Sequence, residues 1–350
     1  MRTFVKLTLV FLLPVAALIA LQYLVDPLDL YPPQLLPPVE LPSREEKVHG
    51  YLATDRDFDA FIMGSSRVMR LDAEYVGSYG YRCYNFGLGN CRPEDLYAVL
   101  GMLLEESAVP PRLIILGLDL ELFHPYLETR SELLNLPGLA RYVKPWMIVP
   151  PPGSDPMLGK MSDSLRMSFV SLWRWVTGRD RDRRNRILPE NGNFASTPLP
   201  PRGAAGVNLG VVLHYVDVFN AYDRLGEVRR ETFEAFLELA SGHGIEVRAF
   251  VTCLHPGMTD YLSRHTPYDA RLRDVKTYLD GLDYPGFTWR DFSGLEGFGG
   301  VESDFLDPAH VGSVNAAGMV DRLLGGPLPP GDCVRGSRSS AGANDPCLDL

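Results

Sequence analysis

The sequence predicts an α/β protein in which a mostly parallel five-stranded sheet is covered by helices on both faces. Short apolar segments recur along the chain at lengths typical of buried strands. Longer amphipathic segments with helical periodicity alternate with them. Glycine follows some of the apolar segments and marks where a strand ends. Alternating strands and helices are typical of a parallel sheet in a three-layer α/β/α arrangement.

The predicted elements follow one another in this alternating order. The strands are expected at 58–63, 83–86, 112–118, 245–252 and 287–292. The helices are expected at 93–106, 220–242, 269–282 and 313–324. Pro93 suits the first turn of its helix, where no backbone N–H is required. In such a sheet, ligands bind beyond the carboxyl ends of the strands.

An uncharged apolar segment, 7–25, lies near the start of the chain. A helix of about 20 apolar residues crosses a bilayer, so residues 1–26 are predicted to be a transmembrane anchor. Arg2 and Lys6 precede the segment and Asp26 follows it. The positive-inside rule therefore places the bulk of the chain outside the cytoplasmic membrane, in the periplasm. A cleaved signal peptide is the alternative, because small residues lie within the segment.

Composition divides the remainder into three parts. Residues 27–54 contain closely spaced prolines, which prevent a helix and favour a stiff extended stalk. Residues 55–326 are predicted to be the α/β domain, with a long insertion at about 121–213 that is rich in proline and polar residues. Residues 327–350 are rich in Gly, Ser and Pro and are predicted to be a flexible tail.

Charge and motif content exclude several classes of protein. The formal net charge is −10, whereas nucleic-acid binding needs a basic face. The segment Gly87-Leu88-Gly89 lacks the third glycine of a dinucleotide-binding loop. No cysteine lies in a C-x-x-C pair, which disfavours a zinc ribbon. We therefore predict no nucleic-acid partner, no cofactor and no metal.

The five cysteines allow two short disulfide loops in an oxidising compartment. One loop would join Cys83 to Cys91, and the other would join Cys333 to Cys347. Cys253 lies in an apolar segment and is expected to be a buried thiol.

Two polar segments carry the predicted chemistry. The segment Gly64-Ser65-Ser66 directly follows the first strand, and Asp307-Pro308-Ala309-His310 precedes the last helix. A serine becomes a nucleophile when a base accepts its proton, and that base needs an orienting acid. The D-x-x-H spacing lets one turn direct both side chains into one cleft. The sequence therefore predicts a serine nucleophile, either Ser65 or Ser66, with His310 as base and Asp307 as acid.

These segments resemble the two conserved blocks of the SGNH (GDSL-like) hydrolase superfamily, G-D-S after the first strand and a C-terminal D-x-x-H. The match gives Ser66 the nucleophile position and Ser65 the position of the aspartate. It covers the ends and the core of 55–326 but not the insertion. With its G-S-S variant and anchor, the chain is similar to membrane-anchored envelope proteins of the teichoic-acid D-alanylation and alginate O-acetylation type. The resemblance implies a flavodoxin-like SGNH fold and transfer of acyl groups on cell-surface polymers.

The resemblance also implies an oxyanion hole built from the serine amide, a glycine amide after the second strand and an asparagine after the third. Gly89 matches the glycine better than Gly87 does. The third strand ends in Gly117-Leu118-Asp119, where the family has G-x-N. An ionised Asp119 has no hydrogen to donate, so Asn90 is the alternative donor.

We therefore expect an extracytoplasmic serine esterase or O-acyltransferase that acts on acyl groups of a cell-envelope polysaccharide or a similar polymer. Its expected partners are this substrate, the inner membrane through the N-terminal helix, and a multi-span membrane acyltransferase. The alternative is a catalytically silent SGNH-like envelope protein that binds polymer or such an acyltransferase. The departure at Asp119 favours this alternative.

Simpler interpretations exist for single residues. Ser66 would serve equally as a helix cap. His310 would fit a structural role, or a metal site with Asp307 and Asp304. His124 and His255 follow predicted strands and are expected to be loop or core histidines.

Overall fold

The computed structural model describes residues 43–150, 185–196 and 209–325, with short helical pieces between 12 and 25 and between 168 and 177. The chain divides into two units: Arg44–Pro150 with Ile187–Leu350, and Met1–Ser43 with Pro151–Arg186. The larger unit contains the sheet and the site discussed below.

Within these described stretches, no helix is long and apolar enough to span a bilayer. Most of the predicted anchor, the proline-rich part of the stalk and the tail lie outside the described residues.

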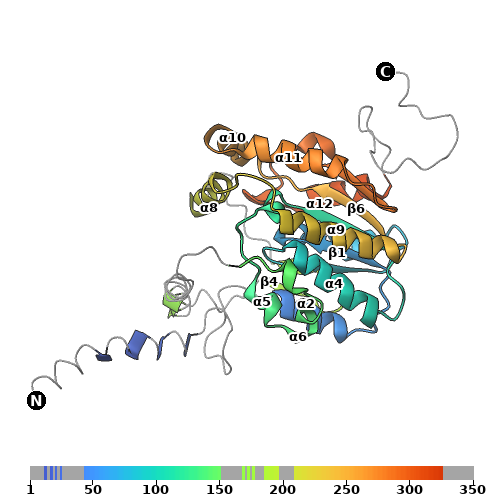
Figure 1. Ribbon diagram of the computed structural model, residues 1–350, viewed down its shortest axis with the longest axis horizontal. Helices are drawn as coiled ribbons and strands as arrows, with labels where there is room; N and C mark the ends of the chain where they lie inside the picture. Colours follow the sequence, from blue (N-terminus) through green and yellow to red (C-terminus); the bar gives the residue numbers. More distant parts are fainter. Residues whose placement is uncertain are drawn as a thin grey trace, which may run out of the picture. The chain divides into compact units, whose positions relative to one another are not determined.

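Five parallel strands form the central sheet in the order β2-β1-β3-β6-β7. Figure 1 labels β1 and β6 of this sheet. Their bounds are Ala60–Gly64 (β1), Cys83–Gly87 (β2), Leu113–Leu118 (β3), Glu246–Val251 (β6) and Phe287–Asp291 (β7). Each corresponds to a predicted strand, so the α/β class and the parallel five-stranded sheet are confirmed. The strand order reverses between β1 and β3, because β2 lies on one side of β1 and β3 on the other. Ligands bind at such a reversal in α/β sheets.

Helices pack on both faces of the sheet, consistent with three layers (Figure 1). One face carries α2 (Ser43–Leu52), α4 (Pro93–Glu106), α8 (Leu209–Asn220), α9 (Glu227–Gly242), α10 (Pro256–His265) and α11 (Tyr268–Asp280). The other face carries α3 (Ala73–Gly77) and α12 (Ser313–Leu324). The helices predicted at 93–106 and 313–324 coincide with α4 and α12, and the helix predicted at 269–282 corresponds to α11.

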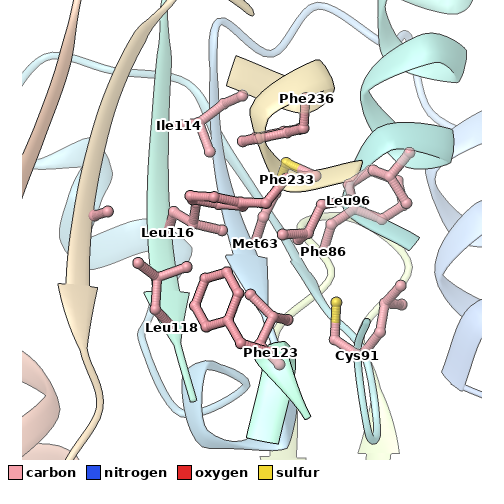
Figure 2. Packing of buried hydrophobic residues seen from close by; sticks show 14 of the residues in the cluster. Met63, Phe86, Cys91, Leu96, Ile114, Leu116, Leu118, Phe123, Phe233 and Phe236 are labelled. Atoms are coloured by element: carbon pink, nitrogen blue, oxygen red, sulfur yellow. The ribbon is translucent and has the colours of Figure 1, made fainter. Parts of the chain in front are cut away.

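Alternation along the strands produces one hydrophobic cluster on each face. Phe61 and Met63 of β1 belong to the cluster with α4 and α9. Figure 2 shows Met63 in this cluster with Phe233 and Phe236 of α9. Ile62 of β1 belongs to the opposite cluster, with α3 and α12. Fully burying such a side chain contributes about 1.5–3 kcal/mol. Both clusters therefore hold β1, and the turn that follows it, in place.

The predicted helix 220–242 is wrong at its beginning, because two helices occupy this region. The first, α8, ends at Asn220, and α9 begins at Glu227. Between them, a Cβ on Gly226 would lie 2.9 Å from the Cα of Pro125. The chain turns where its backbone closely approaches another segment, and such an approach is not visible in a hydrophobic pattern.

The predicted end of the stalk, residue 54, is also wrong. Helix α2 occupies Ser43–Leu52 and is packed into the domain. The ring of Tyr51 is buried against Tyr84 and Phe86, with both pairs of centroids 5.3 Å apart. Lys47 is also fully buried.

Cys83, Cys91 and Cys253 are buried free thiols. The predicted Cys83–Cys91 disulfide is therefore wrong, whereas the expectation for Cys253 is confirmed. Cys83 belongs to the cluster on the α12 face, and Cys91 to the cluster on the α4 face. The two thiols are therefore separated by the sheet. Cys333 and Cys347 lie outside the described residues.

The described parts of the predicted insertion contain only short elements before α8. They are the 3-10 turns η2 (Leu120–Phe123) and η3 (Pro145–Met147), helices α5 (Ser131–Leu134) and α6 (Pro137–Ala140), and strands β4 (Asn185–Ile187) and β5 (Phe194–Ser196). Helix α8 begins at Leu209, inside the predicted insertion.

Candidate active site

Ser66 begins a single 3-10 turn, η1 (Ser66–Val68), directly after β1. The turn is possible because of Gly64, whose φ is +137° and whose added Cβ would lie 2.6 Å from the carbonyl oxygen of Gly117. Such a φ favours glycine. The sequence therefore uses glycine to end β1 and to place Ser66 at the carboxyl edge of the sheet.

Asp307 and His310 lie on a short hairpin made of β8 (Phe305–Asp307) and β9 (His310–Val311). Oδ1 of Asp307 accepts hydrogen bonds from the backbone amides of Ala309, at 2.8 Å, and of His310, at 3.0 Å. The backbone amide of His255 donates to the carbonyl oxygen of Pro308, at 2.9 Å. The turn is thus held internally and is also tied to the loop after β6.

The structure brings Ser66, His310 and Asp307 into one hydrogen-bonded chain. Oγ of Ser66 lies 2.8 Å from Nε2 of His310, although the two residues are 244 positions apart. Nδ1 of His310 lies 2.8 Å from Oδ2 and 2.9 Å from Oδ1 of Asp307. Because a carboxylate only accepts, Nδ1 carries the hydrogen and Nε2 is left to accept the proton of Ser66. This is the arrangement that a nucleophile, base and orienting acid require.

Electrostatic interactions keep Asp307, the last residue of this series of hydrogen bonds, ionised. Burial by itself would raise the pKa of Asp307. The hydrogen bond and charge of His310, together with the two backbone amides, outweigh burial and hold this pKa below its ordinary value. At neutral pH the carboxylate is therefore available to hold His310 in one tautomer.

The neighbouring serine, Ser65, makes a different hydrogen bond. Ser65 is buried, and its Oγ accepts a hydrogen bond from the backbone amide of Arg67, at 3.1 Å. It is the N-cap of η1. Ser65 thus shapes the turn, while Ser66 contacts His310.

Gly89 and Asn90 follow β2 at the same edge of the sheet as Ser66. The edge is shared because Gly87 pairs with Gly64 and the amide of Leu88 donates to the carbonyl of Gly64, at 2.9 Å. The carbonyl of Gly89 accepts from Nη1 of Arg44, at 3.1 Å, and Asn90 is exposed with φ +52°.

Asp119 acts as an acceptor in the structure. Oδ1 of Asp119 accepts a hydrogen bond from Oγ1 of Thr252, at 2.6 Å. The same oxygen lies 3.4 Å from Nη1 of Arg67. The side chain that stands where the resemblance implies an asparagine donor is therefore oriented towards a buried cation.

Sequence reasoning missed this buried cation. Nη1 of Arg67 donates to Oγ1 of Thr252, at 3.0 Å, and Nη2 donates to Glu121 at 2.7 Å and to the hydroxyl of Tyr215 at 2.8 Å. The guanidinium also lies 5.4 Å from the centre of the Tyr215 ring. An arginine directly after Ser66, with the D-x-E segment 119–121 after β3, was the available signal.

The cluster around Arg67 contains one basic group and two acidic groups, Asp119 and Glu121. Burial lowers the pKa of Arg67, but Asp119 and Glu121 raise it well above its ordinary value. Burial raises the pKa of Glu121 despite the opposing charge of Arg67. Arg67 is thus a permanent cation, and Glu121 is the carboxyl that holds its proton more tightly than usual.

A metal site formed by His310, Asp307 and Asp304 would compete with a hydrogen bond that Asp304 already makes. Oδ2 of Asp304 accepts from the amide of Asn315, at 2.7 Å, at the start of α12. Over the described part of the chain, no group of three or more His, Cys, Asp or Glu side chains is arranged to hold a metal ion.

His124 and His255, the two further histidines that follow predicted strands, make local hydrogen bonds. His124 is buried, lies 3.1 Å from the carbonyl of Val218 through Nε2, and accepts from the amide of Tyr126 through Nδ1, also at 3.1 Å. His255 caps α10, because Nδ1 accepts from the amide of Gly257 at 3.1 Å. They are a core and a loop histidine, as expected.

Comparison with known proteins adds no assignment: no family model matches this chain, and no curated protein matches it significantly.

Proposed function

We propose that the chain is a serine esterase or O-acyltransferase with Ser66 as nucleophile, His310 as general base and Asp307 as orienting acid. The observation that carries the proposal is the chain of hydrogen bonds from Ser66 through His310 to Asp307, with 2.8 Å at each step. A chance contact between a serine and a histidine would not require an ionised carboxylate on the other ring nitrogen, where Asp307 lies.

The reaction follows from this geometry. Oγ of Ser66 attacks the carbonyl carbon of an ester while Nε2 of His310 takes its proton. The tetrahedral intermediate collapses, the bond to the leaving alcohol breaks, and His310 returns the proton to that alcohol. Water or a sugar hydroxyl, deprotonated by His310, then attacks the carbonyl carbon of the acyl-enzyme. The bond from that carbon to Oγ of Ser66 breaks, and His310 returns the proton to Oγ. Water completes hydrolysis, and a sugar hydroxyl completes transfer.

The substrate class and location rest on the sequence. The apolar segment 7–25, with Arg2 and Lys6 before it, supports a single-pass anchor with the catalytic domain in the periplasm. The resemblance to SGNH envelope proteins supports an acylated cell-envelope polysaccharide as substrate and a multi-span acyltransferase as partner. A reporter enzyme fused after Leu350 should be active only outside the cytoplasm, and a soluble cytoplasmic fusion would contradict the location.

Labelling with a fluorophosphonate tests the chemistry, because only an activated serine reacts rapidly. The full-length chain in detergent should be labelled and should hydrolyse a small activated ester. Ser66→Ala and His310→Ala should abolish both, whereas Ser65→Ala, the matched control one position away, should retain appreciable activity. Asp307→Asn should be impaired because His310 loses its orientation. These losses should not add, because the residues act as a unit.

Asp119 favours one competing function, a catalytically silent envelope protein. The resemblance implies an asparagine donor there, and this chain has a carboxylate that accepts from Thr252. The backbone amides of Ser66 and Gly89 and the side chain of Asn90 are the oxyanion donors that catalysis would then require. A folded wild-type chain that neither labels nor hydrolyses would favour the silent protein.

A further inference from the structure

We propose that Arg67 is a positioning residue that fixes the nucleophile turn, and with it the contact between Ser66 and His310. This role rests on the proposed function and extends it beyond the triad. Arg67 does not contact His310 or Asp307 through any hydrogen bond described above. Its effect would be exerted through the backbone that it shares with Ser66.

Successive side chains of η1 have opposite environments. Ser66 is half-buried and contacts His310, whereas Arg67 is buried among the ends of the sheet. The backbone amide of Arg67 is bonded to Oγ of Ser65. An anchored Arg67 side chain therefore restrains the backbone on both sides of the Ser66–Arg67 peptide bond.

The guanidinium joins three elements that surround η1. Asp119 and Glu121 follow β3, Thr252 follows β6, and Tyr215 lies on α8. The planar fork of arginine can donate in several directions at once, and an ammonium group lacks this geometry. Lysine would keep the charge here but would lose most of the contacts.

The space around the turn leaves it few other positions. A Cβ on Gly117 would lie 2.2 Å from Cγ1 of Val68, which belongs to the same turn. The turn is thus packed against β3 on one side while Arg67 ties it to β3, β6 and α8. Displacement of a reacting atom by about 1 Å can reduce a rate on the order of 100-fold. Loss of the Arg67 anchor should accordingly lower the reactivity of Ser66 without removing it.

The test measures fluorophosphonate labelling rate, kcat and KM for a small ester on the full-length chain, with thermal unfolding as the folding check. Arg67→Lys should lower the labelling rate and kcat by about 10–100-fold and leave KM within about threefold. Tyr215→Phe, which removes one of the hydrogen bonds to Arg67, should lower both rates by about threefold. Arg82→Met is the matched control: this exposed arginine precedes β2 at the opposite edge of the sheet, and its rates should equal those of wild type.

A merely structural role would lower the amount of folded protein but not the rate per folded molecule. Wild-type labelling rates in folded Arg67→Lys would overturn the role of Arg67. If Arg67→Lys fails to fold, Tyr215→Phe and Thr252→Val decide, and wild-type rates in both would overturn it. An unlabelled wild-type chain would instead overturn the proposed function and this role together, before any variant is compared.

Discussion

Two of the buried cations in the described chain, Arg67 and Lys47, have very different partners. Arg67, at the carboxyl edge, lies between Asp119 and Glu121. Lys47, on α2, contacts the carbonyl oxygens of Asn85 and Gly192 and lies 3.4 Å from Oδ1 of Asn85. Neither side chain is more than 7% exposed, so burial alone does not distinguish the two sites.

The partner decides whether the charge is permanent. Two carboxylates hold the pKa of Arg67 well above its ordinary value, against the effect of burial. Burial lowers the pKa of Lys47 to about 7, and the carboxylate of Glu46 offsets this only in part. The cation beside the proposed nucleophile thus has a fixed charge, whereas the cation of α2 titrates near neutral pH. Arg44, also on α2 but paired with Asp95, separates the effect of the helix from that of the partner.

The largest loss of stability is expected when a buried carboxylate loses the cation that pairs with it. Arg44→Ala leaves Asp95 buried without its partner, where Nε and Nη2 of Arg44 now donate at 2.7 and 2.8 Å. The free energy of unfolding in urea should fall by about 3–5 kcal/mol. Leu52→Ala, at an exposed position of the same helix, should cost less than about 0.5 kcal/mol. A loss below about 1 kcal/mol for Arg44→Ala would show that this pair does not stabilise the fold.

The second largest effect is expected in the pH dependence of stability, because of Lys47. The pKa of Lys47 is 10.5 in the unfolded chain and about 7 in the fold. Between these values the unfolded chain binds a proton that the folded chain does not, so wild-type stability should rise with pH. Relative to Lys47→Met, which cannot titrate, the rise from pH 6.5 to 10 should be roughly 2–5 kcal/mol.

Urea unfolding of both proteins at the two pH values checks this prediction. If the difference between wild type and Lys47→Met stays constant, Lys47 is charged in the fold throughout this range. The contrast with Arg67 would then be lost.

A smaller loss of stability is expected at the Arg67 site when Arg67 and Asp119 are both kept and only a hydrogen bond is removed. Thr252→Val removes the hydroxyl that donates to Asp119 and accepts from Arg67. Unfolding free energy should fall by about 1–3 kcal/mol. Thr288→Val, within β7, should change it by less than about 0.5 kcal/mol, because valine suits a strand. Equal effects of the two variants would mean that the Thr252 hydroxyl stabilises nothing.

The smallest effect is expected at Asp307, whose side chain is 44% exposed. Its lowered pKa contributes stability above the ordinary value of 3.8, which is lost as pH falls through the folded value. Asp307→Asn lacks this contribution. The gap in melting temperature between wild type and Asp307→Asn should therefore be larger at pH 6 than at pH 3. A gap that widens in acid would contradict a lowered pKa.

The sequence by itself determined the sheet. All five strands were predicted because buried parallel strands are short apolar runs, and such runs differ visibly from the amphipathic helices between them. It also identified Asp307, His310 and the adjacent serines Ser65 and Ser66, since the D-x-x-H spacing is local and the serines directly follow a strand. Their catalytic roles and the family resemblance stay predictions.

Only the tertiary structure decided the features that depend on residues distant in the chain. It distinguished Ser66 from Ser65 through the contact with His310, and it separated Cys83 from Cys91 across the sheet. It packed α2 into the domain, and it assembled Arg67 with its carboxylates. The physical reason is common to all four cases. Spacing along a chain specifies which side chains share a local face, whereas hydrogen bonds and ion pairs between elements depend on distances that exist only after the sheet has formed.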